Sequence, residues 1–127
     1  MVNKKAQKLI FNMQNSITEN GINAEELVTS LTELRTYAVA EKMPRLAKGI
    51  RLTFEHIAEY KGFFVPVPED EMIDEEGEVI GTVEAATETD TDSLLYLLSI
   101  MSDANNKMNY EELKEYNIAL KDYADNN

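Results

Sequence analysis

The residue best suited by type to acid–base chemistry or metal binding is the single histidine, His56, which lies in a helical pattern near Glu55 and Glu59. A catalytic or metal-binding histidine needs partner side chains that converge on it, and the chain has no cysteine and no second histidine. The sequence also lacks a glycine-rich phosphate loop, a nucleophile elbow and a zinc-ligand spacing. We therefore expect His56 to be a surface or edge residue, and we expect no enzyme activity, no cofactor and no bound metal.

Carboxylates are the other potential ligands, and eleven of them lie between Glu69 and Asp92. A calcium-binding EF-hand loop needs glycine at its sixth position and oxygen ligands at its first and twelfth positions. Placing Gly77 at the sixth position puts Met72 at the first and Val83 at the twelfth, so both ligand positions fail. Only a loose, weak divalent-ion site stays open as an alternative.

Charge is distributed unevenly along the 127 residues, whose net charge is −12. Residues 1–61 carry nine basic and seven acidic residues, residues 62–106 carry twelve acidic and no basic ones, and residues 107–127 carry three basic and five acidic ones. The central block should repel nucleic acid and anionic membrane surfaces. No apolar run approaches the roughly 20 residues of a spanning helix. We expect a cytoplasmic protein, or one incorporated into a virus particle assembled in the cytoplasm.

Apolar residues at three- and four-residue steps predict five helices, over residues 3–19, 23–41, 44–61, 92–101 and 108–124. Asn23 is a good N-cap with Glu26 three residues further on, as in a capping box. Pro44 suits a first helical position, and Gly62 is expected to end the third helix. We predict an all-α, five-helix body made of two helical hairpins and a third helix, with an inserted extended or β-hairpin acidic arm.

The chain is short enough to form one domain, and its predicted parts follow the charge pattern. Residues 1–61 form a three-helix part, and residues 93–127 form a helical hairpin that packs on it. The arm and linker occupy residues 62–92. The apolar start of the arm, stiffened by prolines, is the predicted partner-binding segment: Phe63, Phe64, Val65, Pro66, Val67 and Pro68. The stretch from Glu69 to Val83 can form an acidic hairpin, with Glu75, Glu76 and Glu78 as its acidic surface.

Residues 22–38 align without gaps on residues 108–124, so the chain can be read as an internal repeat. Asn23 and Leu27 of the first stretch match Asn109 and Leu113 of the second. One reading is a duplicated helical hairpin with pseudo-symmetric packing. The other is that good helix starts converge on the same residues because each has a capping role.

Basic residues of the second and third helices could form a patch, which consists of Arg35, Lys42, Arg45, Lys48 and Arg51. Such a patch could bind nucleic acid or another anionic surface, or it could pair with acidic residues of the same chain. Because the chain is acidic overall and no aromatic residues interleave the basic ones, nucleic acid is not the expected partner.

These observations favour a non-catalytic protein–protein interaction or structural subunit of a larger assembly, in a homo- or hetero-oligomer. An accessory protein of a bacteriophage virion is one context that fits a small, cysteine-free chain. The alternative is an acidic nucleic-acid mimic that inhibits a basic nucleic-acid-binding protein. We expect protein partners and no membrane partner.

Overall fold

The computed structural model describes residues 3–66 and 91–126, and all regular structure in these ranges is helical. The five helices are α1 (Lys4–Asn20), α2 (Ala24–Ala40), α3 (Pro44–Tyr60), α4 (Thr91–Ser102) and α5 (Lys107–Asp125). This confirms the predicted all-α body of five helices. Residues 67–90, which include the predicted β-hairpin from Glu69 to Val83, lie outside the described residues.

Asparagine side chains begin three of the helices. In each case the side-chain oxygen accepts a hydrogen bond from a backbone N–H of the first turn, and the caps are Asn3 in α1, Asn23 in α2 and Asn106 in α5. Each cap typically stabilises a helix by about 1 kcal/mol. Asn23 was predicted in this role, and its Oδ1 atom accepts from the N–H of Glu26 over 3.1 Å. Helix α3 starts instead with Pro44, at a position where an N–H would have no helical partner.

Helices α1 and α3 each end on a residue whose φ angle is positive. Gly21 follows α1 with a φ of 76°, which glycine adopts without a steric penalty. The sequence predicts Gly62 as the end of α3, but Lys61 takes the left-handed conformation there, with a φ of 58°. The chain then turns back towards α3 through Phe63 and Val65, whose side chains are buried.

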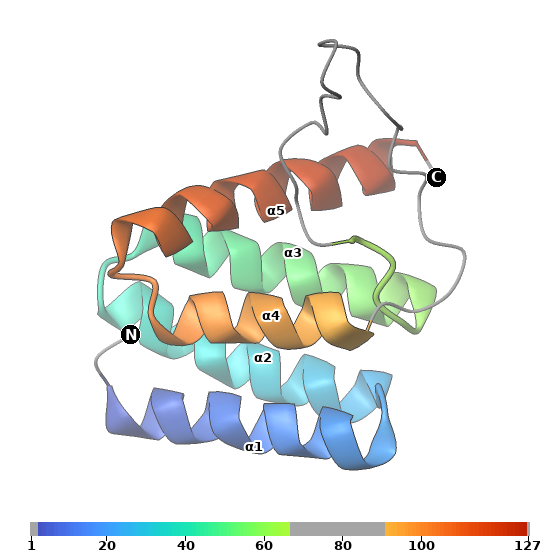
Figure 1. Ribbon diagram of the computed structural model, residues 1–127, viewed down its shortest axis with the longest axis horizontal. Helices are drawn as coiled ribbons and strands as arrows, with labels where there is room; N and C mark the ends of the chain where they lie inside the picture. The colour runs from blue at the N-terminus through green and yellow to red at the C-terminus, as the bar shows by residue number, and fades with distance from the viewer. Residues whose placement is uncertain (1–2, 67–90, 127) are drawn as a thin grey trace, which may run out of the picture.

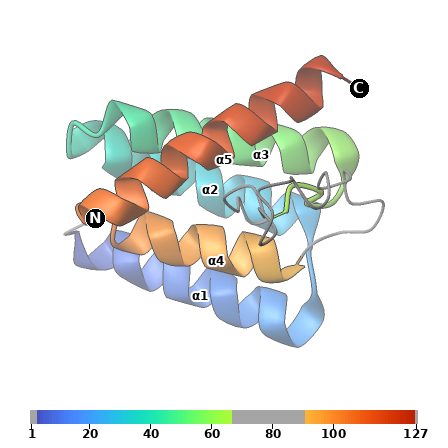
Figure 2. The same cartoon turned by 45° about the horizontal axis from the view of Figure 1, so that its top comes forward.

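The helices contact one another in a closed order, in which α1 touches α2, α2 touches α3, α3 touches α5, α5 touches α4 and α4 touches α1. Figure 1 shows α1 and α5 at opposite edges of the molecule with α4 between them, and α2 and α3 completing the path behind. The tilted view in Figure 2 shows the same arrangement, with α5 crossing over the others at an angle. The last two helices therefore close the bundle started by the first three.

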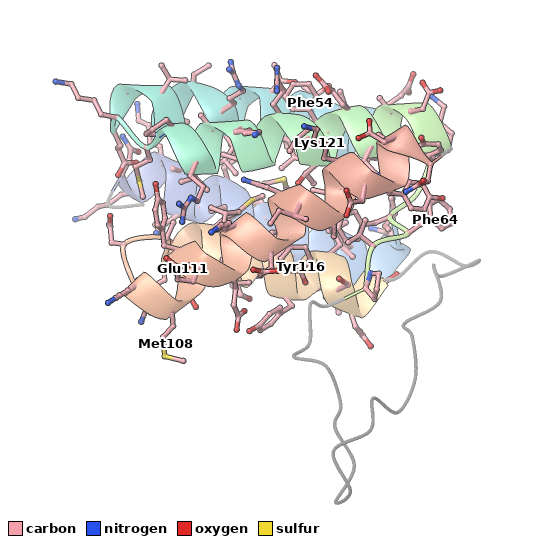
Figure 3. All side chains as sticks on the ribbon, turned by 90° about the horizontal axis from the view of Figure 1, so that it is seen from above. Phe54, Phe64, Met108, Glu111, Tyr116 and Lys121 are labelled. Atoms are coloured by element: carbon pink, nitrogen blue, oxygen red, sulfur yellow. The ribbon has the colours of Figure 1, made fainter. Side chains whose placement is uncertain are left out.

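Helix α4 is apolar almost all round because neighbours cover both of its sides. Its buried residues include Leu94, Leu97, Leu98, Ile100 and Met101. On one side α1 reaches it with polar as well as apolar side chains, and Gln14 of α1 donates a hydrogen bond of 3.1 Å to Ser99 Oγ. On the other side, Tyr116 of α5 points towards it in Figure 3 and hydrogen bonds to Ser93 over 3.0 Å. Burial inside this chain accounts for the composition of α4.

The contact order bears on the internal repeat. The closed sequence of helix–helix contacts stays the same if α1 is exchanged with α4 and α2 with α5. Each hairpin therefore flanks α3 in a similar way. The starts of the two aligned helices differ, however. Asn23 caps α2, whereas its aligned counterpart Asn109 is the third residue of α5, which Asn106 caps. The aligned asparagines therefore have different structural roles.

Candidate functional site

Four of the five residues predicted as a basic patch surround one groove. This first groove lies between α2 and α3, has a volume of about 690 Å³, and is bordered by Arg35, Lys42, Lys48 and Arg51. Its remaining lining is apolar and consists of Val39, Met43, Pro44 and Ala47. The aliphatic parts of lysine and arginine extend such an apolar lining while their charged ends stay in water.

The fifth predicted residue, Arg45, lines a second groove on the other side of α3. This groove lies between α3 and α5, has a volume of about 480 Å³, and shares Pro44 and Lys48 with the first groove. Helix α5 adds Lys114 and Lys121 to it, and Figure 3 shows Lys121 projecting from α5 towards α3. We call the seven basic residues of the two grooves the basic face: Arg35, Lys42, Arg45, Lys48, Arg51, Lys114 and Lys121.

Sequence reasoning missed Lys114 and Lys121 because they lie far along the chain from the other five. The only local signal was their seven-residue spacing, with Ile118 between them, which places all three on one side of a helix. That signal gains meaning only once α5 is known to pack beside α3.

Two members of the basic face are held by partners. The Nη1 atom of Arg45 lies 3.8 Å from Glu111 Oε1, and its guanidinium stacks 4.2 Å from the ring centre of Tyr110. The Nε atom of Arg51 lies 3.9 Å from Oε1 of Glu55, which is four residues further along α3. Within the described residues no ion pair within 4.0 Å forms at the other five: Arg35, Lys42, Lys48, Lys114 and Lys121.

The basic face is a local separation of charge rather than a consequence of net charge. The described residues hold twelve basic and fourteen acidic side chains, which is a net charge of −2. Seven of the twelve basic side chains nevertheless gather around the two grooves. Clustered like charges in a groove with low-polarity walls attract oppositely charged ligands more strongly than isolated charges do.

His56 does not lie at the surface, so the expectation from sequence was wrong. The residue is only 5% exposed, because the rings of Tyr60, Phe63 and Tyr123 pack within 5.4 Å of its ring centre. Its Nε2 atom accepts a hydrogen bond of 3.1 Å from the backbone N–H of Phe64. Burial lowers the pKa of His56 to about 4, so the ring is neutral near pH 7 and holds the returning chain.

The predicted partner-binding segment is divided by its burial. Phe63 and Val65 are buried within this chain, whereas Phe64 and Pro66 are half-buried. Val67, Pro68 and the acidic-surface residues Glu75, Glu76 and Glu78 lie outside the described residues. Partner binding by the segment stays a prediction, and Phe64 is its best-exposed aromatic member among the described residues.

Metal-ligating residues do not gather in the described part of the chain, where no group of three His, Cys, Asp or Glu side chains could hold an ion. The stretch considered for a loose divalent site, around Gly77, lies outside the described residues. None of the described helices has the length and apolar character that crossing a membrane requires.

Comparison with known proteins gave no family model, curated protein or solved structure that matches this chain. Any functional conclusion therefore depends on the basic face itself.

Proposed function

We propose that this protein is a non-catalytic interaction subunit that binds another protein through its basic face. The observation that carries the proposal is the first groove, in which charged side chains border an apolar lining. Protein-binding surfaces commonly combine an apolar centre with a polar rim. Val39 is 54% exposed inside this groove, so a partner side chain could remove it from water.

The composition of the grooves favours protein over nucleic acid. Proteins that bind single strands stack bases on aromatic side chains, and no aromatic residue is among those that line the two grooves in the described structure. Contact with a phosphate backbone buries little apolar surface of the lining, whereas contact with apolar side chains of a protein removes that surface from water, which is favourable. The proposal includes a structural role in a larger assembly. That this assembly is a virus particle remains a prediction from the sequence.

Site-specific photo-crosslinking in the cells that naturally make the protein tests this proposal. We would place a benzoylphenylalanine at the position of Val39 in the first groove, and at the position of Phe11 as the control. Phe11 is 61% exposed on α1, outside both grooves. We expect a discrete protein adduct from Val39 that disappears when Lys48→Glu is added, and none from Phe11. Equal adducts at both positions, or no adduct at Val39, would contradict the proposal.

A further inference from the structure

Both grooves are lined by Pro44 and Lys48 of α3, so they lie next to each other at the start of this helix. We infer that they form one docking track for an acidic, amphipathic segment of a partner protein, running from α2 across the start of α3 to α5. This inference rests on the proposed function and specifies the chemistry of the partner. Three features of the track define the segment that fits it.

The first feature is an exposed apolar side chain in each groove. Val39 lies in the first groove and is 54% exposed, and Ile118 lies in the second and is 47% exposed. A partner segment that crosses the track can cover both if it carries apolar side chains at two separate positions. Segments of this kind, with apolar anchors laid into a groove, are a recurring mode of peptide recognition.

The second feature is the position of the cations that form no ion pair with other described residues. Lys48 lies where the grooves meet, Arg35 and Lys42 border the first, and Lys114 and Lys121 border the second. Carboxylates between the two apolar anchors of the segment would therefore face Lys48. Arg45 is already engaged by Glu111 and Tyr110, so its role is to shape the wall of the second groove.

The third feature is the charge of the rest of the described structure. Outside the basic face, the described residues carry fourteen acidic and five basic side chains, so an acidic segment is attracted at the basic face and repelled on balance by the rest. Complementary potentials of this kind set the orientation and the rate of association.

We assign the segment to another protein because of where this chain's own acidic residues are attached. The chain leaves α3 beyond Tyr60, whereas the part of α3 that lines the track is limited to Pro44–Arg51. A helix of 17 residues is about 25 Å long, and Figure 1 shows the two ends of α3 at opposite ends of the bundle. The described chain thus leaves α3 at the end of the bundle that is remote from the track.

Fluorescence anisotropy with the full-length protein tests the inference. The probes are a labelled synthetic peptide of leucine and glutamate with helical spacing, polyglutamate of equal length, the peptide of residues 69–92, and a single-stranded oligonucleotide. We expect the leucine–glutamate peptide to bind more tightly than polyglutamate and the oligonucleotide. Because its contacts are partly ionic, binding should weaken between about 50 and 300 mM salt.

Matched variants then locate the binding. We expect Lys48→Glu to weaken binding by about tenfold, since it replaces attractive contacts with repulsive ones at the junction of the grooves. Val39→Ser and Ile118→Ser should each weaken it by about three- to tenfold through lost apolar contact. Lys107→Glu and Phe11→Ser, which alter exposed residues outside both grooves, should change it by less than about twofold.

The inference is overturned by several results. The first is that the leucine–glutamate peptide does not bind, or that polyglutamate binds equally tightly. The second is that the oligonucleotide binds more tightly than the leucine–glutamate peptide and depends on Lys48. The third is that Lys107→Glu and Lys48→Glu weaken peptide binding equally. The inference is also overturned if the leucine–glutamate peptide binds only after Glu75, Glu76 and Glu78 of this protein are changed to glutamine. The protein's own acidic segment would then be the occupant of the track. If these peptides fail while crosslinking at Val39 still depends on Lys48, the proposed function stands and the acidic track does not.

Discussion

The backbone N–H of Phe64 donates a hydrogen bond of 3.1 Å to the Nε2 atom of His56. Because Nε2 accepts, the proton of the neutral ring lies on Nδ1. This bond joins the chain that follows α3 back to α3 itself, and Tyr123 of α5 packs on the same ring at 4.9 Å. His56 therefore ties three parts of the structure together, and only in its neutral form.

Stability should fall as this histidine becomes protonated. Burial lowers the pKa of His56 from 6.5 to about 4 in the folded protein, so between these values the unfolded chain binds the proton more readily. The contribution of His56 to the unfolding free energy is full well above pH 6.5 and decreases as the pH falls towards 4. Between pH 7 and pH 5 the unfolding free energy should fall by about 2 kcal/mol through this residue. Urea unfolding at several pH values measures it.

The control for this prediction is His56→Gln, which keeps an acceptor for Phe64 but cannot titrate in this range. The difference in unfolding free energy between the two proteins should therefore change with pH, while the carboxylates contribute equally to both. A difference that stays constant from pH 7 to pH 5 would show that His56 is not desolvated in solution.

Phe63 and Phe64 should respond differently to truncation. Phe63 is fully buried, so Phe63→Ala should lower the unfolding free energy by about 3–5 kcal/mol. Phe64 is half-buried, and Phe64→Ala should lower it by about 1–2 kcal/mol. Thermal unfolding by circular dichroism compares the two. Equal losses would contradict the different burial, and only Phe64→Ala is suited to testing whether this segment also contacts a partner.

Gly49 should resist replacement although it lies inside α3. Alanine stabilises a helix interior by about 0.5–1 kcal/mol relative to glycine. A Cβ at this position would, however, lie 2.8 Å from Asn117 Oδ1 and 2.9 Å from Leu113 Cδ1, both on α5. Since overpacking costs about 1–3 kcal/mol, we expect Gly49→Ala to be destabilising by about 1–2 kcal/mol. In an Asn117→Ala background the loss should be smaller, and a stabilising Gly49→Ala would mean that α3 and α5 are less closely packed.

The hydroxyl of Tyr116 should matter more than that of a surface tyrosine. It donates a hydrogen bond of 3.0 Å to the carbonyl of Ser93 and lies 3.0 Å from the Ser93 hydroxyl, and both residues are fully buried. Tyr116→Phe should lower the unfolding free energy by about 1–3 kcal/mol. Tyr96→Phe, at an exposed site where the hydroxyl donates to Glu112, should change it by about 0.5 kcal/mol or less. The reverse order would contradict the buried pair.

Local signals in the sequence predicted the helices well, since caps and apolar spacing act within one or two turns. Asn23 illustrates this, because its contact with the N–H of Glu26 depends only on neighbouring residues. His56 could not be placed in the same way. Its burial depends on Tyr123 and on the return of Phe63 and Phe64, which are tertiary contacts.

The candidate site shows the same division. Arg35, Lys42 and Lys48 were predicted as a patch because they lie on or between two consecutive helices, and the structure places them around one groove. The apolar lining and the second groove depend on how the helices pair, as does the contribution of Lys114 and Lys121. Charge composition alone could not reveal that pairing.

The position of α4 beside α1 has a consequence for how the protein is made. While the chain emerges from the ribosome, α1 can pair with α2, and α2 with α3, but α4 cannot pack on α1 until Ser102 has been synthesised. At about 5–20 residues per second, this interval lasts a few seconds beyond the completion of α3. During this interval the nascent N-terminal half lacks the helix that covers this side of α1 in the folded protein.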